Sequence, residues 1–536
     1  MVTGLNSNLK FRDSDNQDMA GEYYKNVRKF PENLGIMPKE FGAFYTDKEI
    51  VTYILSQLDI NKKSVILDPA CGCGSFLFPL YEMANKCESL NLLNIYGIDI
   101  DERAISFTRN TIKSMVNRAN AMTSTANILL GDFITNNLAR KSSIFGSLSF
   151  YDVLDKGGFD YIIGNPPYNI KNVSKKKVSL ISKVHREIAN NSKNMPIYFI
   201  LKGLELLREG GVIAFVLPKS LLYVKKYNNF RQYLLNNFKI IRIAEIGMNF
   251  KDVRGEQIIA FIEKTIPSEL SEIEFITLRN LSKTPSFSVQ QSYFIGKASI
   301  PVLSDQDIFK VINRVNQNSI KLSEFCEFQV FRGVSLQMIK IIDNVRSSNA
   351  FQPENSFIRG KDIMKAGLRR VCLFDSSTGS APKMENLKSP KIILQNIYSS
   401  ESGIISFLDN KGVVTSETVT NVLMPDYVKL KFFYAMLNSK LINFYLFNEV
   451  FSQSRMTMHV DGYYLSQIPI VWKENSDESR EILNIADLML NCRECELKEL
   501  LSRLDSQIYR LYNLDASSIE IIEKSMSKML SKRSKW

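Results

Sequence analysis

Histidine is almost absent from this chain, with only His185 and His459 among its 536 residues. Neither histidine lies in a recognisable motif, so the sequence gives no sign of a histidine base or of a metal site. Long apolar runs are also missing, because charged residues interrupt even the stretch from Pro196 to Leu217. A membrane-spanning helix needs about 20 apolar residues. These absences predict a protein with no bound metal and no association with a membrane.

Cysteine is sparse, odd in number and irregularly spaced, with seven residues in all. The one CxxC, Cys492 and Cys495, has no second pair, so ordinary thiols in a reducing compartment are favoured over zinc ligands. Residues 1–16 are polar and lack the apolar core of a secretion signal. We therefore expect a cytoplasmic protein.

Positive charge is abundant, with a formal net charge of +12 and a pI near 9.1, which favours a polyanionic partner. The charge is concentrated in two runs. Residues Lys171 to Met195 carry seven Lys or Arg against the single Glu187, and Lys219 to Arg242 carry six against no acid. Taken alone, these runs fit two solvated surface loops as well as they fit a binding surface.

Strand-like and helix-like segments alternate over the first half of the chain, which predicts a parallel sheet with helices on both faces. The alternation fades around Pro267 to Ser299, and shorter strands with glycine turns follow Ile300. A helical segment begins near Asp477. The expected strands are 64–67, 95–100, 128–130, 159–164, 212–216, 391–395 and 412–415, and the expected helices are 51–58, 76–86, 102–117 and 197–207.

A glycine loop, DPACGCGSF at Asp68 to Phe76, lies between an expected strand and an expected helix. Gly72 and Gly74 let the backbone approach a ligand closely, and Asp99 ends the next strand, where a carboxylate can accept both hydroxyls of a ribose. The loop lacks the phosphate-binding lysine of a P-loop. The pattern therefore favours an adenosine without phosphates, with Asp132 and Phe133 after the third strand as contacts to its base.

The sequence NPPY, Asn165 to Tyr168, directly follows an apolar strand. The two prolines stiffen the loop, so that the Asn165 side chain and the Pro166 carbonyl can both accept hydrogen bonds from one planar NH2 group. Tyr168 can stack on the base that carries this group. A base inside a duplex must be flipped out to reach such a pocket. A proline-rich turn with a buried tyrosine is the structural alternative.

With these motifs the chain resembles the gamma-class, TaqI-type, adenine-N6-specific DNA methyltransferases of restriction-modification systems. GAFYT (42–46), YGIDID (96–101) and GDF (131–133) resemble further cofactor motifs of that family, although Cys73 stands where the family has Ser or Thr. FRGVS (331–335), RGKDI (359–363), PKIILQNI (390–397), AMLNSKLINFYL (435–446) and QIPI (467–470) resemble its target recognition domain.

The resemblance implies a Rossmann-like class I S-adenosylmethionine-dependent methyltransferase sheet, α/β in class, with a C-terminal mixed α+β target recognition domain and a helical tail. It implies an N-terminal arm at 1–40, a catalytic domain at 41–270, a recognition domain at 300–475 and a helical segment at 476–536. Phe250 is the candidate for a second aromatic against the flipped base, with an ordinary core role as the alternative. The implied catalytic residues are Asn165, Pro166, Pro167 and Tyr168, and the implied cofactor contacts are Tyr45, Thr46, Asp68, Ala70, Gly72, Gly74, Asp99, Ile100, Asp132 and Phe133.

The expected activity is site-specific methylation of adenine N6 in double-stranded DNA by a monomeric enzyme bound to the nucleoid. Three alternatives stay open: a protein glutamine methyltransferase, a fused restriction endonuclease, and a subunit of a larger modification complex. The long region after Ile300 and the basic charge disfavour the first, and the lack of a clear carboxylate and lysine cluster disfavours the second. A cognate nuclease or specificity partner is compatible with the third.

Overall fold

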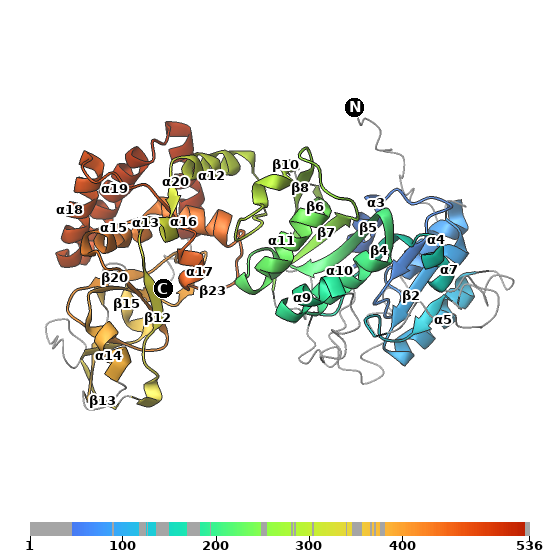
Figure 1. Cartoon of the computed structure of the whole chain (residues 1–536), viewed down its shortest axis with the longest axis horizontal. Coiled ribbons are helices and arrows are strands. Elements are labelled where there is room, and N and C mark those ends of the chain that lie inside the picture. Colours follow the sequence, from blue (N-terminus) through green and yellow to red (C-terminus); the bar gives the residue numbers. More distant parts are fainter. Residues whose placement is uncertain are drawn as a thin grey trace. The chain divides into compact units, whose positions relative to one another are not determined.

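The computed structural model contains two compact units, Met1–Lys297 and Ala298–Trp536 (Figure 1). The expected arm at 1–40 lies outside the described residues. No helix in the described part of the chain is long and apolar enough to cross a membrane. The structure describes residues 46–87, 90–116, 125, 127–135, 150–168, 183–192, 194–247, 255–279, 282–283, 286–302, 305–338, 340–345, 356–364, 367–368, 371–375 and 381–530.

A ten-stranded sheet forms the centre of the N-terminal unit, in the order β10-β8-β6-β7-β5-β4-β1-β2-β3 with β9 paired to β8. Strands β3, β2, β1, β4 and β5 are parallel, whereas β7 runs antiparallel between β5 and β6. The strands are β1 (Ile66–Asp68), β2 (Ile95–Asp99), β3 (Ile128–Leu130), β4 (Phe159–Gly164), β5 (Leu207–Pro218), β6 (Lys239–Gly247), β7 (Gln257–Glu263), β8 (Glu272–Arg279), β9 (Ser282–Lys283) and β10 (Phe287–Gln290).

Helices cover both faces of this sheet, as the sequence predicts. On β4, Ile163 joins the core packed by α3, α4 and α5, while a Cβ at Gly203 of α10 would lie 3.7 Å from Ile162 on the opposite face. This is the two-residue alternation of a strand buried on both sides. The helices are α3 (Lys48–Ser56), α4 (Leu77–Cys87), α5 (Glu102–Met115), α7 (Phe150–Asp155), α9 (Lys183–Ser192), α10 (Met195–Leu206) and α11 (Asn228–Asn237).

The alternation of strands and helices ends after Pro267, as expected, but the sheet itself continues. Strand β8 pairs parallel with β6, and β10 pairs antiparallel with β8, so the sheet continues to Gln290. The expected catalytic boundary at residue 270 therefore falls before three strands of the same sheet, β8, β9 and β10. Buried Ile273 and Phe275 alternate with glutamates along β8, which is the pattern of a strand near the sheet edge.

The C-terminal unit combines small sheets with helices. Its two four-stranded sheets have the orders β12-β22-β18-β20 and β13-β17-β14-β21. Paired two-stranded ribbons are β11–β24, β15–β16 and β19–β23. The strands are β11 (Ile320–Lys321), β12 (Gln329–Arg332), β13 (Ile341–Val345), β14 (Ser356–Ile358), β15 (Ile363–Met364), β16 (Gly367–Leu368), β17 (Val371–Phe374), β18 (Lys391–Gln395), β19 (Ile397–Tyr398), β20 (Ser406–Asp409), β21 (Val414–Thr415), β22 (Val419–Leu423), β23 (Met458–His459) and β24 (Pro469–Ile470).

The C-terminal helices pack onto the helices that follow β22. Contacts join α15 to α18 and α16 to α20, and Lys440 at the start of α16 pairs with Glu523 of α20 at 2.7 Å. The segment after residue 476 is therefore part of the same compact unit as the mixed region before it. The helices are α12 (Gln306–Gln317), α13 (Leu322–Phe325), α14 (Ala381–Lys388), α15 (Tyr427–Asn438), α16 (Lys440–Tyr445), α17 (Gly462–Leu465), α18 (Asp477–Asn491), α19 (Glu494–Leu511) and α20 (Ala516–Leu530).

Candidate active site

The glycine loop turns tightly at the carboxyl end of β1. The Cys71 N–H donates to the Ile98 carbonyl at 3.1 Å, and the Gly74 N–H donates back to the Cys71 carbonyl at 2.8 Å. Gly72 and Gly74 have φ angles of 49° and 87°, a region that favours glycine. A Cβ at Gly74 would lie 2.6 Å from the Phe78 ring. The loop shape therefore requires glycine at Gly74 for both its backbone angle and its packing.

Asp99 is fixed beside this loop at the end of β2. Its Oδ2 accepts from the Gly72 N–H at 2.8 Å, and its Oδ1 accepts from the Asp101 N–H at 2.9 Å. On the other side, Thr108 Oγ1 of α5 donates to the Gly72 carbonyl at 2.8 Å. Gly72 is thus held through both of its backbone groups. Each carboxylate oxygen has room for a second donor, since one oxygen can accept two hydrogen bonds.

The segment after β3 completes this side of the site. The Gly131 N–H donates to the Asp99 carbonyl at 2.8 Å, and Asp132 Oδ1 accepts from the Ile134 N–H at 3.0 Å. Phe133 is buried, with its ring centroid 5.1 Å from that of Phe199 on α10. The Phe133 ring therefore packs this segment against α10 and does not offer an exposed face for stacking.

Two apolar side chains are exposed at the same edge. Ile100 after β2 is 57% exposed, and Leu130 at the end of β3 is 47% exposed. Leu130 lies close to Ile100, because it is the register partner of Asp99, the residue directly before Ile100. Exposed aliphatic residues can pack against the two faces of a nucleoside's base, and the fixed carboxylate beside them can bind its ribose.

The NPPY motif leaves the sheet at the end of β4, next to β1. Pro166 is buried, while Asn165, Pro167 and Tyr168 are half-buried. The link to the glycine loop runs through Asp68. A Cβ at Gly164, the last residue before the motif, would lie 2.8 Å from Asp68 Oδ1, which also accepts from the Ala70 N–H at 3.1 Å.

Burial dominates the electrostatics of these groups. It raises the pKa of Asp68 well above the ordinary range, and the neighbouring Asp99 carboxylate adds to the shift. Burial also raises the pKa of Asp99, whereas the hydrogen bonds from the Asp101 and Gly72 amides lower it. Two carboxyls with raised pKa values next to each other favour a positively charged ligand, since a cation stabilises their ionised forms.

The two loop cysteines are packing residues, as the sequence predicts. Cys71 and Cys73 are both buried, and burial followed by the nearby carboxylates raises the pKa of the Cys71 thiol well above its usual value. A protonated, buried thiol is a poor nucleophile. Burial likewise raises the pKa of the Tyr168 phenol, so this side chain presents a neutral ring.

The basic run from Lys219 to Arg242 is mostly structural, contrary to a role in phosphate binding. Lys219 is fully buried, pairs with Glu245, and lies 3.9 Å from Glu256. Its N–H also donates to the Glu256 carbonyl at 2.9 Å. Lys219 therefore ties the end of β5 to the end of β6 and the start of β7.

Three further cations of that run have protein partners. Arg231 is buried and donates to the carbonyls of residues 221 and 224, Lys239 pairs with Glu263 at 2.8 Å, and Arg242 pairs with Glu274. Among the six cations of this run, only Lys225 and Lys226 are exposed. Most of the first run, Lys171 to Met195, lies outside the described residues.

The structure thus brings most expected site residues to one edge of the sheet. Thr46 is buried directly before α3. Tyr45 and Phe250 lie outside the described residues. Sequence reasoning missed Thr108, a buried helix residue without a motif, and Leu130, whose exposure only the fold reveals. Within the described residues, no group of three His, Cys, Asp or Glu side chains is arranged to hold a metal ion.

Two family models match separate parts of the chain. Residues 93–251 match the Eco57I restriction-modification methylase, and residues 355–470 match the TaqI-like C-terminal specificity domain. The first match includes Asp99 and the NPPY motif, and the second includes most of the small sheets of the C-terminal unit.

Curated relatives match over part of their length. The Type II methyltransferase M.VspI of a Vibrio species is 27% identical over 230 residues, which cover 42% of this chain and 49% of the relative. The Type I restriction enzyme MpnII methylase subunit of Mycoplasma pneumoniae is 28% identical over 242 residues, covering 43% and 41%. The chain thus spans about half the length, or less, of these relatives.

A solved structure shares the fold over most of the chain. The Type IIL restriction-modification enzyme MmeI, solved in complex with DNA, has a TM-score of 0.53 and 13% identity, covering 95% of this chain and 78% of that one. The expected fold class, a class I methyltransferase sheet with a C-terminal specificity domain, is confirmed. The chain is therefore similar to restriction-modification methylases over residues 93–251 and to TaqI-like specificity domains over residues 355–470.

Proposed function

We propose that this protein transfers a methyl group from S-adenosylmethionine to N6 of a flipped-out adenine within a specific sequence of double-stranded DNA. The observation that carries the proposal is the contact between the two motifs. Asp68 of the cofactor loop lies directly against Gly164, from which Asn165 and the rest of NPPY continue. A methyl donor held on the loop and an acceptor nitrogen held at Asn165 would therefore be neighbours.

The residues at the edge fit S-adenosylmethionine, which supplies an electrophilic methyl on a sulfonium when bound. Asp99 is fixed by two backbone amides and has acceptor capacity for the ribose hydroxyls. Ile100 and Leu130 supply apolar contacts for the adenine ring, and Asp132 supplies an acceptor for its amino group. Gly72 and Gly74 keep the loop open for the methionine part, whose two positive charges suit buried Asp68 and half-buried Asp99.

The target adenine would be held by NPPY. Its amino group is a poor nucleophile because the lone pair is delocalised into the ring. The Asn165 side-chain oxygen and the Pro166 carbonyl would accept hydrogen bonds from its two N–H groups and favour a more tetrahedral nitrogen. That nitrogen would attack the methyl carbon in line while the bond from methyl to sulfur breaks, which leaves a neutral thioether, and the extra N6 proton would pass to solvent. The Tyr168 ring stacks on the base and offsets part of the stacking lost on flipping. Phe250 is proposed as the opposite face of this slot.

The C-terminal unit is proposed to select the DNA sequence, in keeping with its match to a specificity domain. One observation favours a second candidate, a catalytic component that requires a partner. The similar Mycoplasma pneumoniae protein is a methylase subunit of a Type I restriction enzyme. A specificity subunit or a cognate nuclease is therefore the kind of partner to test.

The test is transfer of labelled methyl from S-adenosylmethionine to unmethylated bacterial genomic DNA by the wild type and by Asn165→Ala. We expect labelled DNA with the wild type and a large loss with the variant, because one of the two acceptors is removed. Label that enters a protein of the lysate, with unlabelled DNA, would support the glutamine alternative. If only cell extract restores DNA labelling, the partner-dependent candidate is favoured.

A further inference from the structure

Four segments that are distant in sequence converge on one turn of the C-terminal unit, between β21 and β22. We call this turn, Ser416 to Val419, the 416–419 corner. The first segment follows β12, where the Glu417 N–H donates to the Val334 carbonyl at 2.9 Å. A Cβ on Gly333 would collide with the Thr415 carbonyl, so this close approach requires glycine.

The second segment is the turn between β14 and β15. The Gly360 N–H donates to Thr418 Oγ1 at 3.0 Å, and a Cβ at Gly360 would lie 2.7 Å from the Thr418 carbonyl oxygen. Gly360 thus permits a second close backbone approach to the same turn. The glycines of FRGVS and RGKDI are therefore explained by one place in the fold.

The third and fourth segments arrive together as the β19–β23 ribbon. The Asn396 N–H donates to the Thr418 carbonyl at 3.4 Å, and the Val460 N–H donates to the Asn396 carbonyl at 2.8 Å. Asn396 Nδ2 and His459 Nδ1 are 3.0 Å apart. Thr420 Oγ1 bonds to both Asn396 Oδ1, at 3.2 Å, and the Val460 carbonyl, at 3.0 Å.

Beneath the corner lies a buried polar network. Thr415, Ser416, Thr420 and Asn421 are all at most 1% exposed. The Thr415 hydroxyl and the Asn421 side chain bond to each other at 2.8 to 3.0 Å. A buried network with its hydrogen bonds satisfied holds its members in one arrangement. The corner is therefore a rigid base for the side chains that project from it.

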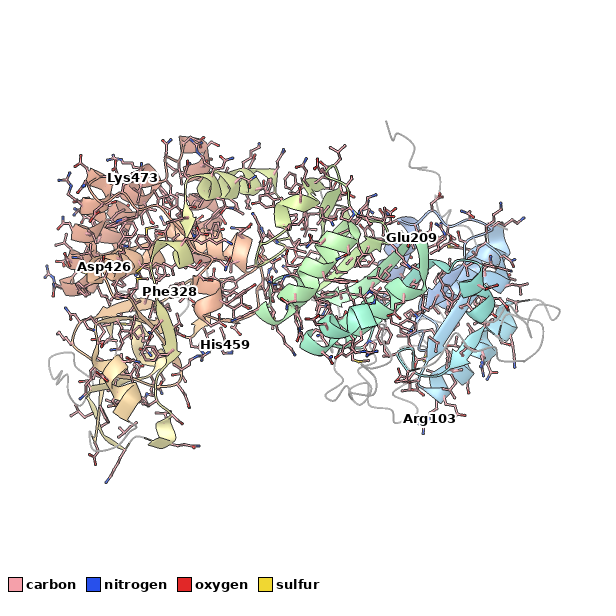
Figure 2. All side chains as sticks on the ribbon, viewed as in Figure 1. Arg103, Glu209, Phe328, Asp426, His459 and Lys473 are labelled. Carbon is pink, nitrogen blue, oxygen red and sulfur yellow. The ribbon has the colours of Figure 1, made fainter. Side chains whose placement is uncertain are left out.

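The projecting side chains are exposed and come from all four segments. They are Arg332, Lys361, Ile397, Thr418 and His459, and the exposed acid among them is Glu417. Arg332 Nη1 contacts the Glu417 carbonyl at 3.4 Å, and Ile397 is the register partner of His459. Figure 2 labels His459 at the surface of this unit, where Figure 1 labels β23.

This set has the chemistry that reads base edges in DNA. Arginine and lysine donate to guanine, threonine and histidine exchange hydrogen bonds with either type of base, and an isoleucine side chain contacts the methyl group of thymine. We propose that the 416–419 corner reads part of the recognition sequence, with Arg332, Lys361 and His459 as its specificity-determining residues. The inference rests on the proposed function and assigns sequence reading to one surface of the specificity domain.

The experiment uses the full chain and begins with the wild type on unmethylated genomic DNA. Single-molecule sequencing identifies the methylated sequence, and binding is then measured on duplexes with that site and with each of its base pairs changed. Absence of any methylation by the wild type would count against the proposed function itself, separately from this inference.

The variants are Arg332→Ala, Lys361→Ala and His459→Ala, with Lys473→Ala as the control. Lys473 is exposed in the same unit, is labelled in Figure 2, and takes no part in the corner. We expect at least one corner variant to lose about fivefold to a hundredfold in discrimination at one base pair, while the control keeps wild-type specificity.

Two results would overturn the inference. One is that all three corner variants methylate the wild-type sequence with unchanged discrimination at every base pair. The other is that they weaken binding equally for all sequences and lower the salt dependence, which is the behaviour of phosphate contacts. Conservative variants, Arg332→Lys and Lys361→Arg, keep the test decisive if an alanine variant unfolds.

Discussion

Replacing Gly74 with alanine tests whether the shape of the cofactor loop depends on this glycine. The substitution has two separate costs. An L-residue at a φ of 87° costs about 1–2 kcal/mol relative to glycine. The new Cβ would also lie 2.6 Å from the buried Phe78 ring, and such overpacking costs about 1–3 kcal/mol. We therefore expect a loss of roughly 2–5 kcal/mol in the free energy of unfolding of the N-terminal unit.

Gly157→Ala is the matched control. Gly157 has a φ of 109°, but a Cβ there would meet no atom within 4 Å. It should therefore show the backbone cost alone, about 1–2 kcal/mol. Urea unfolding measures both variants, and calorimetry measures their affinity for S-adenosylmethionine. We expect the affinity to fall at least about tenfold for Gly74→Ala and to stay near the wild-type value for Gly157→Ala.

The double variant Gly74→Ala with Phe78→Leu isolates the steric cost. A smaller side chain at position 78 gives the new methyl group room. The loss in the free energy of unfolding of the double variant should therefore be about 1–3 kcal/mol smaller than the sum of the losses of the two single variants. The reasoning is refuted if Gly74→Ala is no less stable than Gly157→Ala and binds the cofactor normally.

Three further predictions concern the groups around the site. Lys219→Met leaves Glu245 and the buried Glu256 without their shared cation and should cost about 3–5 kcal/mol in the free energy of unfolding, measured in urea. The exposed Lys225→Met should stay within about 0.5 kcal/mol of the wild type, and equal effects would contradict the ion pair of buried Lys219. Because burial raises the pKa of Asp68 and a cation favours its ionised form, cofactor affinity should rise with pH toward that raised pKa and level off above it. Calorimetry in buffers of different ionisation enthalpy should detect proton release on binding, and a flat pH profile would refute this. Thr108→Val removes the hydroxyl that bonds to the Gly72 carbonyl and should weaken cofactor binding by about 1 kcal/mol, with unchanged affinity as the contrary result.

The parallel half of the sheet was predictable because its strands are short apolar runs bounded by turn residues. The strands at 128–130 and 159–164 occur as expected. Carboxyl ends of neighbouring parallel strands meet at one edge, so motifs spread from Asp68 to Asn165 come together without any further information. The same argument places Asp99 beside the glycine loop, where it accepts from Gly72.

Other elements were not predictable from the same patterns. Helix α15 is buried almost all round from Leu430 to Asn438, so it lacks the apolar stripe that marks a surface helix. The ion pairs of buried Lys219 and half-buried Arg242 involve acids 26 and 32 residues further along the chain. The basic run from Lys219 to Arg242 therefore resembles an exposed binding surface in the sequence, although most of its charged groups have partners within the fold.

The 416–419 corner could not be predicted from sequence patterns for a related reason. Its side chains come from segments as far apart as Arg332 and His459, and each segment is short. Gly333 and Gly360 could be noticed as turn residues, but only the fold shows that both approach the same turn. Likewise, the burial of Phe133 depends on Phe199 of α10.

The most direct test of the central claim is nucleoside analysis of DNA methylated by the purified protein with labelled S-adenosylmethionine. Wild-type protein should yield N6-methyladenine as the labelled nucleoside, and Asn165→Ala should yield almost none while still binding the cofactor. Label in N4-methylcytosine or 5-methylcytosine, or equal N6-methyladenine from the variant, would contradict the assignment of Asn165 and its motif to the adenine amino group.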